Sequence, residues 1–159
     1  MMISYETGTN TFQFRAACII LHRDKVLMQR AEHNQLWFIP GGRVEFGETA
    51  EETIEREMME EYGAPIYDRK LFWVIENFID FPDRKVHELG MFFLVNLPRD
   101  HSIYHHVEEF QGMEEGFVNR WINIDELDQY TVIPEFVASE IRHLDHTTGV
   151  KHIKNRAVR

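Results

Sequence analysis

The segment Gly42–Ala64 reads GRVEFGETAEETIEREMMEEYGA, and it contains the clearest structural signals of the chain. Thr49 is a good helix N-cap, and Glu52 three residues later completes a capping box. Gly63 supplies the left-handed position that commonly ends a helix. The spacing therefore predicts a helix over residues 50–62.

Glu57, Glu60 and Glu61 gather on one side of this helix. At 100° per residue they fall within an arc of roughly 100°. They border an apolar stripe made of Ala50, Ile54 and Met58. Carboxylates crowded at the edge of a core repel one another and raise each other's pKa unless a cation lies between them. A compact cation that prefers oxygen ligands, Mg²⁺ or Mn²⁺, is the expected occupant.

A solvated acidic helix face is the other reading of such a run of charge. Two features of the sequence argue against it. Glu57 and Glu61 are like charges four residues apart with no lysine between them. The helix is also preceded by Pro40-Gly41-Gly42, a turn that exposes its backbone. The pattern therefore favours a metal site.

The fixed residues of this segment resemble a complete Nudix box. They are Gly42, then after five residues Glu48, then after seven residues Arg56-Glu57-Met58, and then Glu60-Glu61 and Gly63-Ala64, each pair after one residue. The resemblance extends to Trp37–Gly42 before the box and to Trp121–Leu127 late in the chain, and it covers residues 11–145. It implies an α/β fold, an α/β/α sandwich with a mixed β-sheet between helices.

The resemblance also implies roles for the residues of the box. In Nudix hydrolases this segment binds Mg²⁺ or Mn²⁺, so Glu57, Glu60 and Glu61 are the implied ligands, helped by a backbone carbonyl near Gly41 or Gly42. Glu48 would complete the cluster or bond to Arg56, which would orient it. A catalytically silent nucleotide-binding or regulatory module is the alternative, but such modules typically lose box residues that this chain keeps.

The implied reaction is attack of water on phosphorus in a nucleoside diphosphate that is linked to another group. The partner would therefore be a small molecule derived from a nucleotide. A nucleotide sugar, a compound like ADP-ribose and a (deoxy)nucleoside triphosphate all fit this description. The sequence does not choose between them.

Further candidate residues lie outside the box. Arg15, Arg30 and Arg43 are candidate phosphate contacts, with a surface ion pair as the alternative for Arg30. Glu76 and Glu88 stand among apolar residues of adjacent predicted strands, where they would line a cleft or serve as satisfied polar residues of the sheet.

An acidic loop late in the chain holds Glu114 and Glu115, between Gly112 and Gly116. We expect one of the two to reach the metal site as a general base, because glycines let the backbone bend. A solvated acidic loop is the alternative.

The rest of the chain predicts one domain, residues 11–145, between a loose polar tail, 1–10, and a basic tail, 146–159. With 159 residues the chain can bury about 70% of its unfolded surface. The basic tail would be solvated or would complete a homodimer. Strands are predicted at Phe12–Leu21, Val26–Arg30, Trp37–Ile39, Lys70–Ile79, Val86–Leu97 and Phe117–Ile122, a polar loop at 98–115, and a second helix at Pro134–Leu144.

Charge and composition exclude some partners. The formal net charge of −10 argues against duplex nucleic acid or an anionic membrane, since either requires a basic face. The sequence shows no apolar leader and no run of about 18 apolar residues, so neither secretion nor membrane insertion is expected. Cys18, the single cysteine, lies in an apolar strand and is expected to be buried and inert. We therefore expect a cytoplasmic protein.

Overall fold

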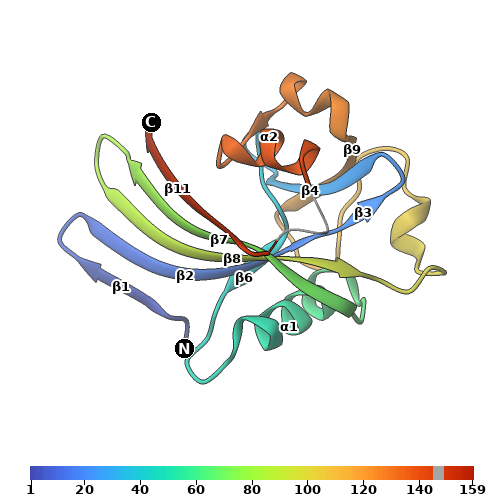
Figure 1. Cartoon of the computed structure of the whole chain (residues 1–159), viewed down its shortest axis with the longest axis horizontal. Helices are drawn as coiled ribbons and strands as arrows, with labels where there is room; N and C mark the ends of the chain where they lie inside the picture. The colour runs from blue at the N-terminus through green and yellow to red at the C-terminus, as the bar shows by residue number, and fades with distance from the viewer. Residues whose placement is uncertain (145–148) are drawn as a thin grey trace.

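The computed structural model describes residues 1–144 and 149–159, and a six-stranded mixed sheet lies at its centre (Figure 1). The order is β1-β2-β8-β7-β11, with β6 also paired to β2. β2 and β8 are parallel, β7 and β8 form an antiparallel hairpin, and β11 is parallel to β7. The bounds are β1 Ser4–Thr7, β2 Asn10–Ile19, β6 Gly41–Arg43, β7 Tyr67–Asp80, β8 Lys85–Asn96 and β11 Lys151–Val158.

Smaller elements complete the described chain. Three strands form a second sheet, β3 Leu21–His22, β4 Lys25–Ala31 and β9 Phe117–Asn123, and β5 Leu36–Trp37 pairs with β10 Thr131–Val132. The helices are α1 Ala50–Tyr62, α2 Phe136–Arg142 and the 3-10 helices η1 Ser102–His105 and η2 Ile124–Gln129. In this part of the chain, neither α-helix has the length and apolar character needed to cross a membrane.

The two faces of the central sheet carry the two halves of the core. Successive residues of a strand point to opposite faces, so Cys18 packs with Ile54 of α1 while Ile19 packs with Val137 of α2. Figure 1 shows α1 and α2 on opposite sides of the sheet. The prediction of an α/β/α sandwich with a mixed sheet is confirmed. Cys18 is fully buried, and burial raises the pKa of its thiol, as expected for an inert cysteine.

Helix α1 begins and ends where the sequence signals place it. The amide of Glu52 donates to the Thr49 hydroxyl at 3.1 Å, and the Glu52 carboxylate accepts from the Thr49 amide at 2.7 Å. Gly63 has a φ of 61°, the left-handed conformation that closes the helix.

Both predicted tails contain strands, so the prediction that they are tails is wrong for these strand residues. The predicted domain end at 145 and the first part of the basic tail, 146–148, lie outside the described residues. Ser4–Thr7 form β1 against β2, and the Ile3 amide donates to Val44 at 2.7 Å. Lys151–Val158 form β11, which pairs with residues 73–80 of β7. Both are edge strands with much exposed, polar sequence, and for this reason they lack the apolar alternation of a buried strand. The predicted loop at 98–115 also contains η1.

Glu48 fixes the way in which the chain enters α1. One of its carboxylate oxygens accepts from the Glu45 amide at 2.9 Å and from the Thr53 hydroxyl at 3.1 Å. The Arg56 guanidinium donates to both oxygens, at 2.8 and 2.9 Å. These bonds to Arg56 hold the pKa of Glu48 at about 2, against an ordinary value of 4.5. The loop before the helix is thereby tied to the second turn of the helix.

This arrangement predicts an acid-sensitive contribution to stability. Because the pKa of Glu48 is lower in the folded chain, its contribution is complete above about pH 4.5 and disappears as the pH falls toward 2. At pH 7 we expect Glu48→Gln to lower the free energy of unfolding by roughly 2–3 kcal/mol. Urea unfolding at several pH values between 7 and 3 measures this. The difference between parent and variant should shrink as the solution is acidified.

Glu126→Gln is the matched control, because Glu126 is an exposed glutamate on η2. The control should follow the parent at every pH. A Glu48→Gln deficit that stays the same size from pH 7 to pH 3 would contradict the role assigned to the Glu48–Arg56 pair.

Candidate active site

Glu57, in the middle of α1, packs directly against Gly42 in the backbone of β6. A Cβ atom added to Gly42 would overlap the Glu57 carboxylate, so a larger residue there would displace this side chain. The Glu57 side chain is 12% exposed, and one of its oxygens accepts from Arg56 at 2.7 Å. The spacing of Gly42 and Glu57 in the sequence therefore corresponds to a direct packing contact between strand and helix.

Glu61, one turn later, is buried with a relative exposure of 2%. Burial is the main reason why the pKa of Glu61 rises to about 9, and the negative charge of Glu57 raises it further. The positive charge of Arg15 opposes this rise. Glu60 differs from both, because its side chain is 57% exposed and meets Arg56 at 3.3 Å. The structure thus places two of the three predicted ligands at the edge of the core and the third at the surface.

The charges suit a divalent cation, although no metal cage is preformed. Within residues 1–144 and 149–159, no three His, Cys, Asp or Glu side chains are arranged so that they could hold an ion. Arg56 binds Glu57 and Glu60, while Glu61 points into the core. However, every candidate side-chain ligand is a carboxylate, and carboxylate oxygens are ligands that hard cations prefer. A positive charge between Glu57 and Glu61 would relieve the repulsion that raises the pKa of Glu61.

A buried polar network lies behind Glu61. The Gln29 amide donates to Glu61 and to the Tyr62 hydroxyl, each at 3.5 Å, and to Asn119 at 3.2 Å. Tyr62 donates to Asn119 at 2.5 Å. Gln29 and Asn119 are 3% and 1% exposed. No sequence pattern marks these residues, because only the pairing of β4 with β9 brings Gln29 opposite Asn119.

The acidic loop is tied to the end of α1. The Met113 amide donates to the Glu61 carbonyl at 2.7 Å, and Phe110 and Asn119 exchange backbone hydrogen bonds at 2.9 and 2.8 Å. Glu114, the residue after Met113, lies near the box. Its pKa is raised by partial burial and by the charges of Glu57 and Glu60. Of the two glutamates that the sequence selected in this loop, the structure brings Glu114 into electrostatic contact with the box.

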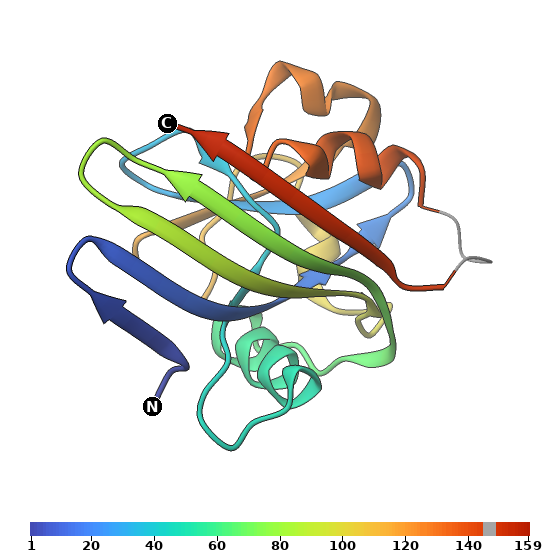
Figure 2. The ribbon, with the colours of Figure 1, turned by 60° about the vertical axis from the view of Figure 1, so that its left-hand side comes forward.

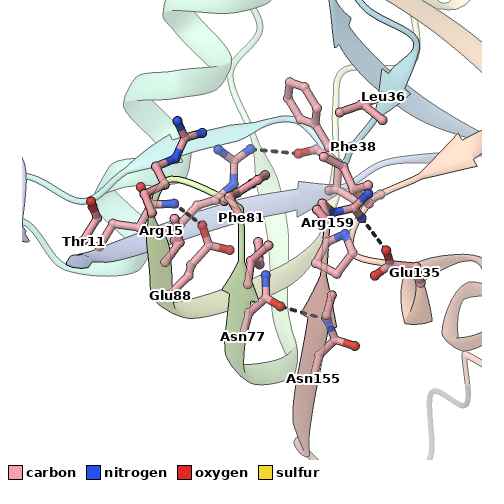
Figure 3. A pocket seen from close by; sticks show the side chains of 18 of the residues that line it. Thr11, Arg15, Leu36, Phe38, Asn77, Phe81, Glu88, Glu135, Asn155 and Arg159 are labelled. Carbon is pink, nitrogen blue, oxygen red and sulfur yellow. Dashed lines mark hydrogen bonds and ion pairs between the residues drawn. The ribbon is translucent and has the colours of Figure 1, made fainter. Parts of the chain in front are cut away.

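A cavity of about 500 Å³ lies on the α2 side of the central sheet, over β2, β8, β7 and β11 (Figure 3). Three of the candidate substrate-binding residues, Arg15, Arg43 and Glu88, line it. Arg15 donates to the Ile39 carbonyl at 3.0 Å and lies over the Phe38 ring at 5.5 Å. Arg15 and Arg43 face each other across the pairing of β2 and β6, immediately beside Gly42. The box glutamates themselves do not line the cavity. The links between the two are Arg43, which directly follows Gly42 in β6, and the positive charge of Arg15, which acts on Glu61.

Two predicted site residues lie elsewhere. Glu76 occupies the opposite face of β7, where it meets His152 at 2.8 Å, because neighbouring residues of a strand alternate between faces. Arg30 is 8% exposed, donates to three carbonyls of the following turn, and pairs with Glu109 at 2.9 Å. It lies 5.3 Å from the Trp37 ring centre. Glu76 does not line the cavity, and Arg30 holds a turn together.

Comparisons with known proteins agree with this geometry. A family model described as NUDIX domain matches residues 12–144. YvcI of Bacillus subtilis, an uncharacterized Nudix hydrolase, is 30% identical over 117 residues, which cover 74% of this chain and 70% of that protein.

Solved structures of similar fold include a MutT Nudix hydrolase from Burkholderia pseudomallei. It has a TM-score of 0.62 and 21% identity, over 81% of this chain and 96% of that chain. A MutT structure from a study of Aliivibrio salmonicida and Vibrio cholerae has a TM-score of 0.56 and 25% identity, over 83% and 95% of the two chains. With the matched box and the match over most of its length, this chain belongs to the Nudix hydrolase family.

Proposed function

We propose that this Nudix hydrolase is a pyrophosphohydrolase that depends on Mg²⁺ or Mn²⁺ and cleaves a nucleoside diphosphate linked to another group. The family acts on small molecules derived from nucleotides and generally uses divalent metals. The main support in this chain is one juxtaposition. The Glu57 carboxylate packs against Gly42, whose neighbour Arg43 lines the cavity together with Arg15, and the positive charge of Arg15 acts on Glu61.

Each part of this arrangement has a chemical role. Glu57, Glu61 and Glu60 would hold the cation, with a backbone carbonyl near Gly42. When bound, the cation supplies charge neutralisation at the phosphoryl oxygens and makes the attacking water more acidic. Arg56 orients Glu57 through its 2.7 Å bond and is itself fixed by Glu48.

Bond making and breaking would follow from this placement. Arg15 and Arg43 bind the phosphates and hold phosphorus in position for attack. A new bond forms between the water oxygen and phosphorus, the anhydride oxygen leaves with the second product, and Glu114 accepts the proton of the water. The products are a nucleoside monophosphate and a phosphorylated remainder, or pyrophosphate when the substrate is a triphosphate.

Several features remain predictions from the sequence. They include the choice among nucleotide sugars, ADP-ribose-like compounds and (deoxy)nucleoside triphosphates, a homodimer, the exclusion of duplex nucleic acid and membranes, and residence in the cytoplasm. The alternative of a silent binding module is tested by turnover itself. Incubation with a panel of these compounds and Mg²⁺, with products identified by mass, separates the two functions.

The first prediction from this proposed function concerns the metal. EDTA should abolish hydrolysis of the best compound in the panel, and Mg²⁺ or Mn²⁺ in excess should restore it, because carboxylates alone cannot neutralise a phosphoryl group. The rate is measured from the amount of product formed over time, which ion-exchange chromatography separates from the substrate. Undiminished turnover in chelator would show that no divalent cation takes part.

A second prediction concerns the ligands. Glu57→Gln and Glu61→Gln should each lower the rate by about 10²–10⁴-fold, or roughly 3–5 kcal/mol of transition-state stabilisation. Glu51→Gln, on the exposed side of the same helix, should change it little. The melting temperature of metal-free Glu61→Gln should not fall, because the change removes a carboxyl group whose charge is disfavoured by burial. Near-normal turnover would exclude the substituted glutamate as a ligand.

The third prediction concerns the proton acceptor. Glu114→Ala should lower kcat by about 10²-fold while KM changes little, since the residue acts on water rather than on substrate. Glu115→Ala is the matched control and should stay near the parent. If single substitutions at Glu108, Glu109, Glu114 and Glu115 all leave kcat within a few-fold of the parent, the loop does not provide the base. Glu60 would then be the first candidate.

A further inference from the structure

One side of the cavity is built by residues outside the NUDIX match, which ends at residue 144. β11 pairs in parallel with β7 over its full length, from Lys151 opposite Trp73 to Val158 opposite Asp80, and forms an edge of the central sheet (Figure 2). Asn155, Ala157 and Arg159 line the cavity from this side. We call these three residues the C-terminal wall.

The alternation of β11 separates this wall from the solvent-facing side of the strand. Asn155 is opposite Asn77 of β7, and the two side chains meet in the cavity, while Lys154 is opposite Glu76 on the other face. Asn155 is half-buried and Lys154 is exposed. Neighbouring residues of one strand therefore differ in their access to the cavity, which provides a matched pair for experiment.

The amide of Asn155 donates to that of Asn77 at 2.8 Å (Figure 3). Among the described residues, neither side chain makes another hydrogen bond that the structure records. Asn77 is only 2% exposed, so the position of its amide is fixed by the surrounding sheet. Each amide has a carbonyl and an N–H₂ group, so the pair offers a free donor group and a free acceptor side by side. Glu88, which accepts from Gln13, adds a carboxylate to the same cavity.

Polar and charged side chains such as Gln13 and Arg84 also line the cavity, and several other lining residues are suited to the flat faces of a ring. Phe38, Ile79, Phe81 and Phe92 are among them. A nucleobase has two apolar faces and an edge of hydrogen-bonding groups, and amide side chains pair with such edges in a bidentate manner. The combination of aromatic walls with an amide pair therefore favours the base as the occupant.

We propose that the C-terminal wall determines substrate specificity, with Asn155 and Asn77 reading the hydrogen-bonding edge of the nucleobase. The inference rests on the proposed function for the assumption that the ligand is a nucleotide. Arg15 and Arg43 would hold the phosphates at the other end, beside the box. Selection of the base would thus lie in a strand that contains no catalytic residue.

Binding of nucleoside 5′-monophosphates tests this without any hydrolysis, because these compounds carry a base and a phosphate but no anhydride. Affinities for AMP, GMP, CMP and UMP are measured by calorimetry in the presence of Mg²⁺, on the parent, Asn155→Leu, Asn155→Asp and the control Lys154→Leu. The parent should prefer one base. Asn155→Leu should bring the affinities for the four bases to within twofold of one another, Asn155→Asp should change the order of the bases, and Lys154→Leu should match the parent. Thermal melting establishes that each variant is folded.

Two results would overturn the proposal. One is a parent that binds all four monophosphates within twofold of one another. The other is a preference that survives both Asn155 substitutions within twofold. Failure of the proposed function gives a different result, in which no anhydride is hydrolysed while the monophosphates still bind with a preference that depends on Asn155.

Discussion

The guanidinium of Arg56 is the interaction on which the rest of the site depends. It donates to both oxygens of Glu48, to one oxygen each of Glu57 and Glu60, and to the carbonyl of Arg43. One planar cation therefore connects the loop before the helix, the helix itself and strand β6. Its neighbours raise the pKa of Arg56 further above its usual high value, so it stays charged at any pH at which the chain is folded. No lysine has the five donors that this geometry needs.

Glu61 illustrates the opposite situation. Its carboxylate is buried beside Glu57, and its contacts are with the neutral amide of Gln29 rather than with a cation. The fold thus neutralises Glu48, Glu57 and Glu60 through Arg56, while the charge of Glu61 is not neutralised in the same way. Such a division is expected at a functional site, where local electrostatic strain is tolerated because a ligand relieves it.

The features that sequence analysis predicted well are those set by local chemistry. The limits of α1 follow from Thr49, Glu52 and Gly63, whose interactions span a few residues. The box pattern selected both Gly42 and Glu57, but their packing contact was not predicted. Side-chain contacts that depend on the pairing of distant strands could not be predicted from the sequence. Gln29 meets Asn119 only through the register of β4 on β9, and Asn155 meets Asn77 only through β11 on β7.

Two errors have simple physical causes. The residues of β11 alternate between a cavity and solvent, so their polarity resembles that of a tail, although eight of them pair with β7. Glu76 and Glu88 were grouped because both are acidic residues in adjacent strands. In the observed register, Glu88 is opposite Asn77, one residue beyond Glu76, and that single step moves Glu76 to the other face.

The two parallel pairings of the central sheet, β7 with β11 and β2 with β8, also bear on how the molecule folds. Asn77 and Asn155 are 78 residues apart in the sequence, and Gln13 and Glu88 are 75 apart, whereas the bonds that define α1 are local. Contacts between distant residues require closure of long loops, which slows their formation. We expect the helix with its acidic residues to form from local signals, and the cavity to be complete only when both ends of the chain have joined the sheet. A molecule that fills the cavity therefore binds the fully folded chain and stabilises it in proportion to its concentration.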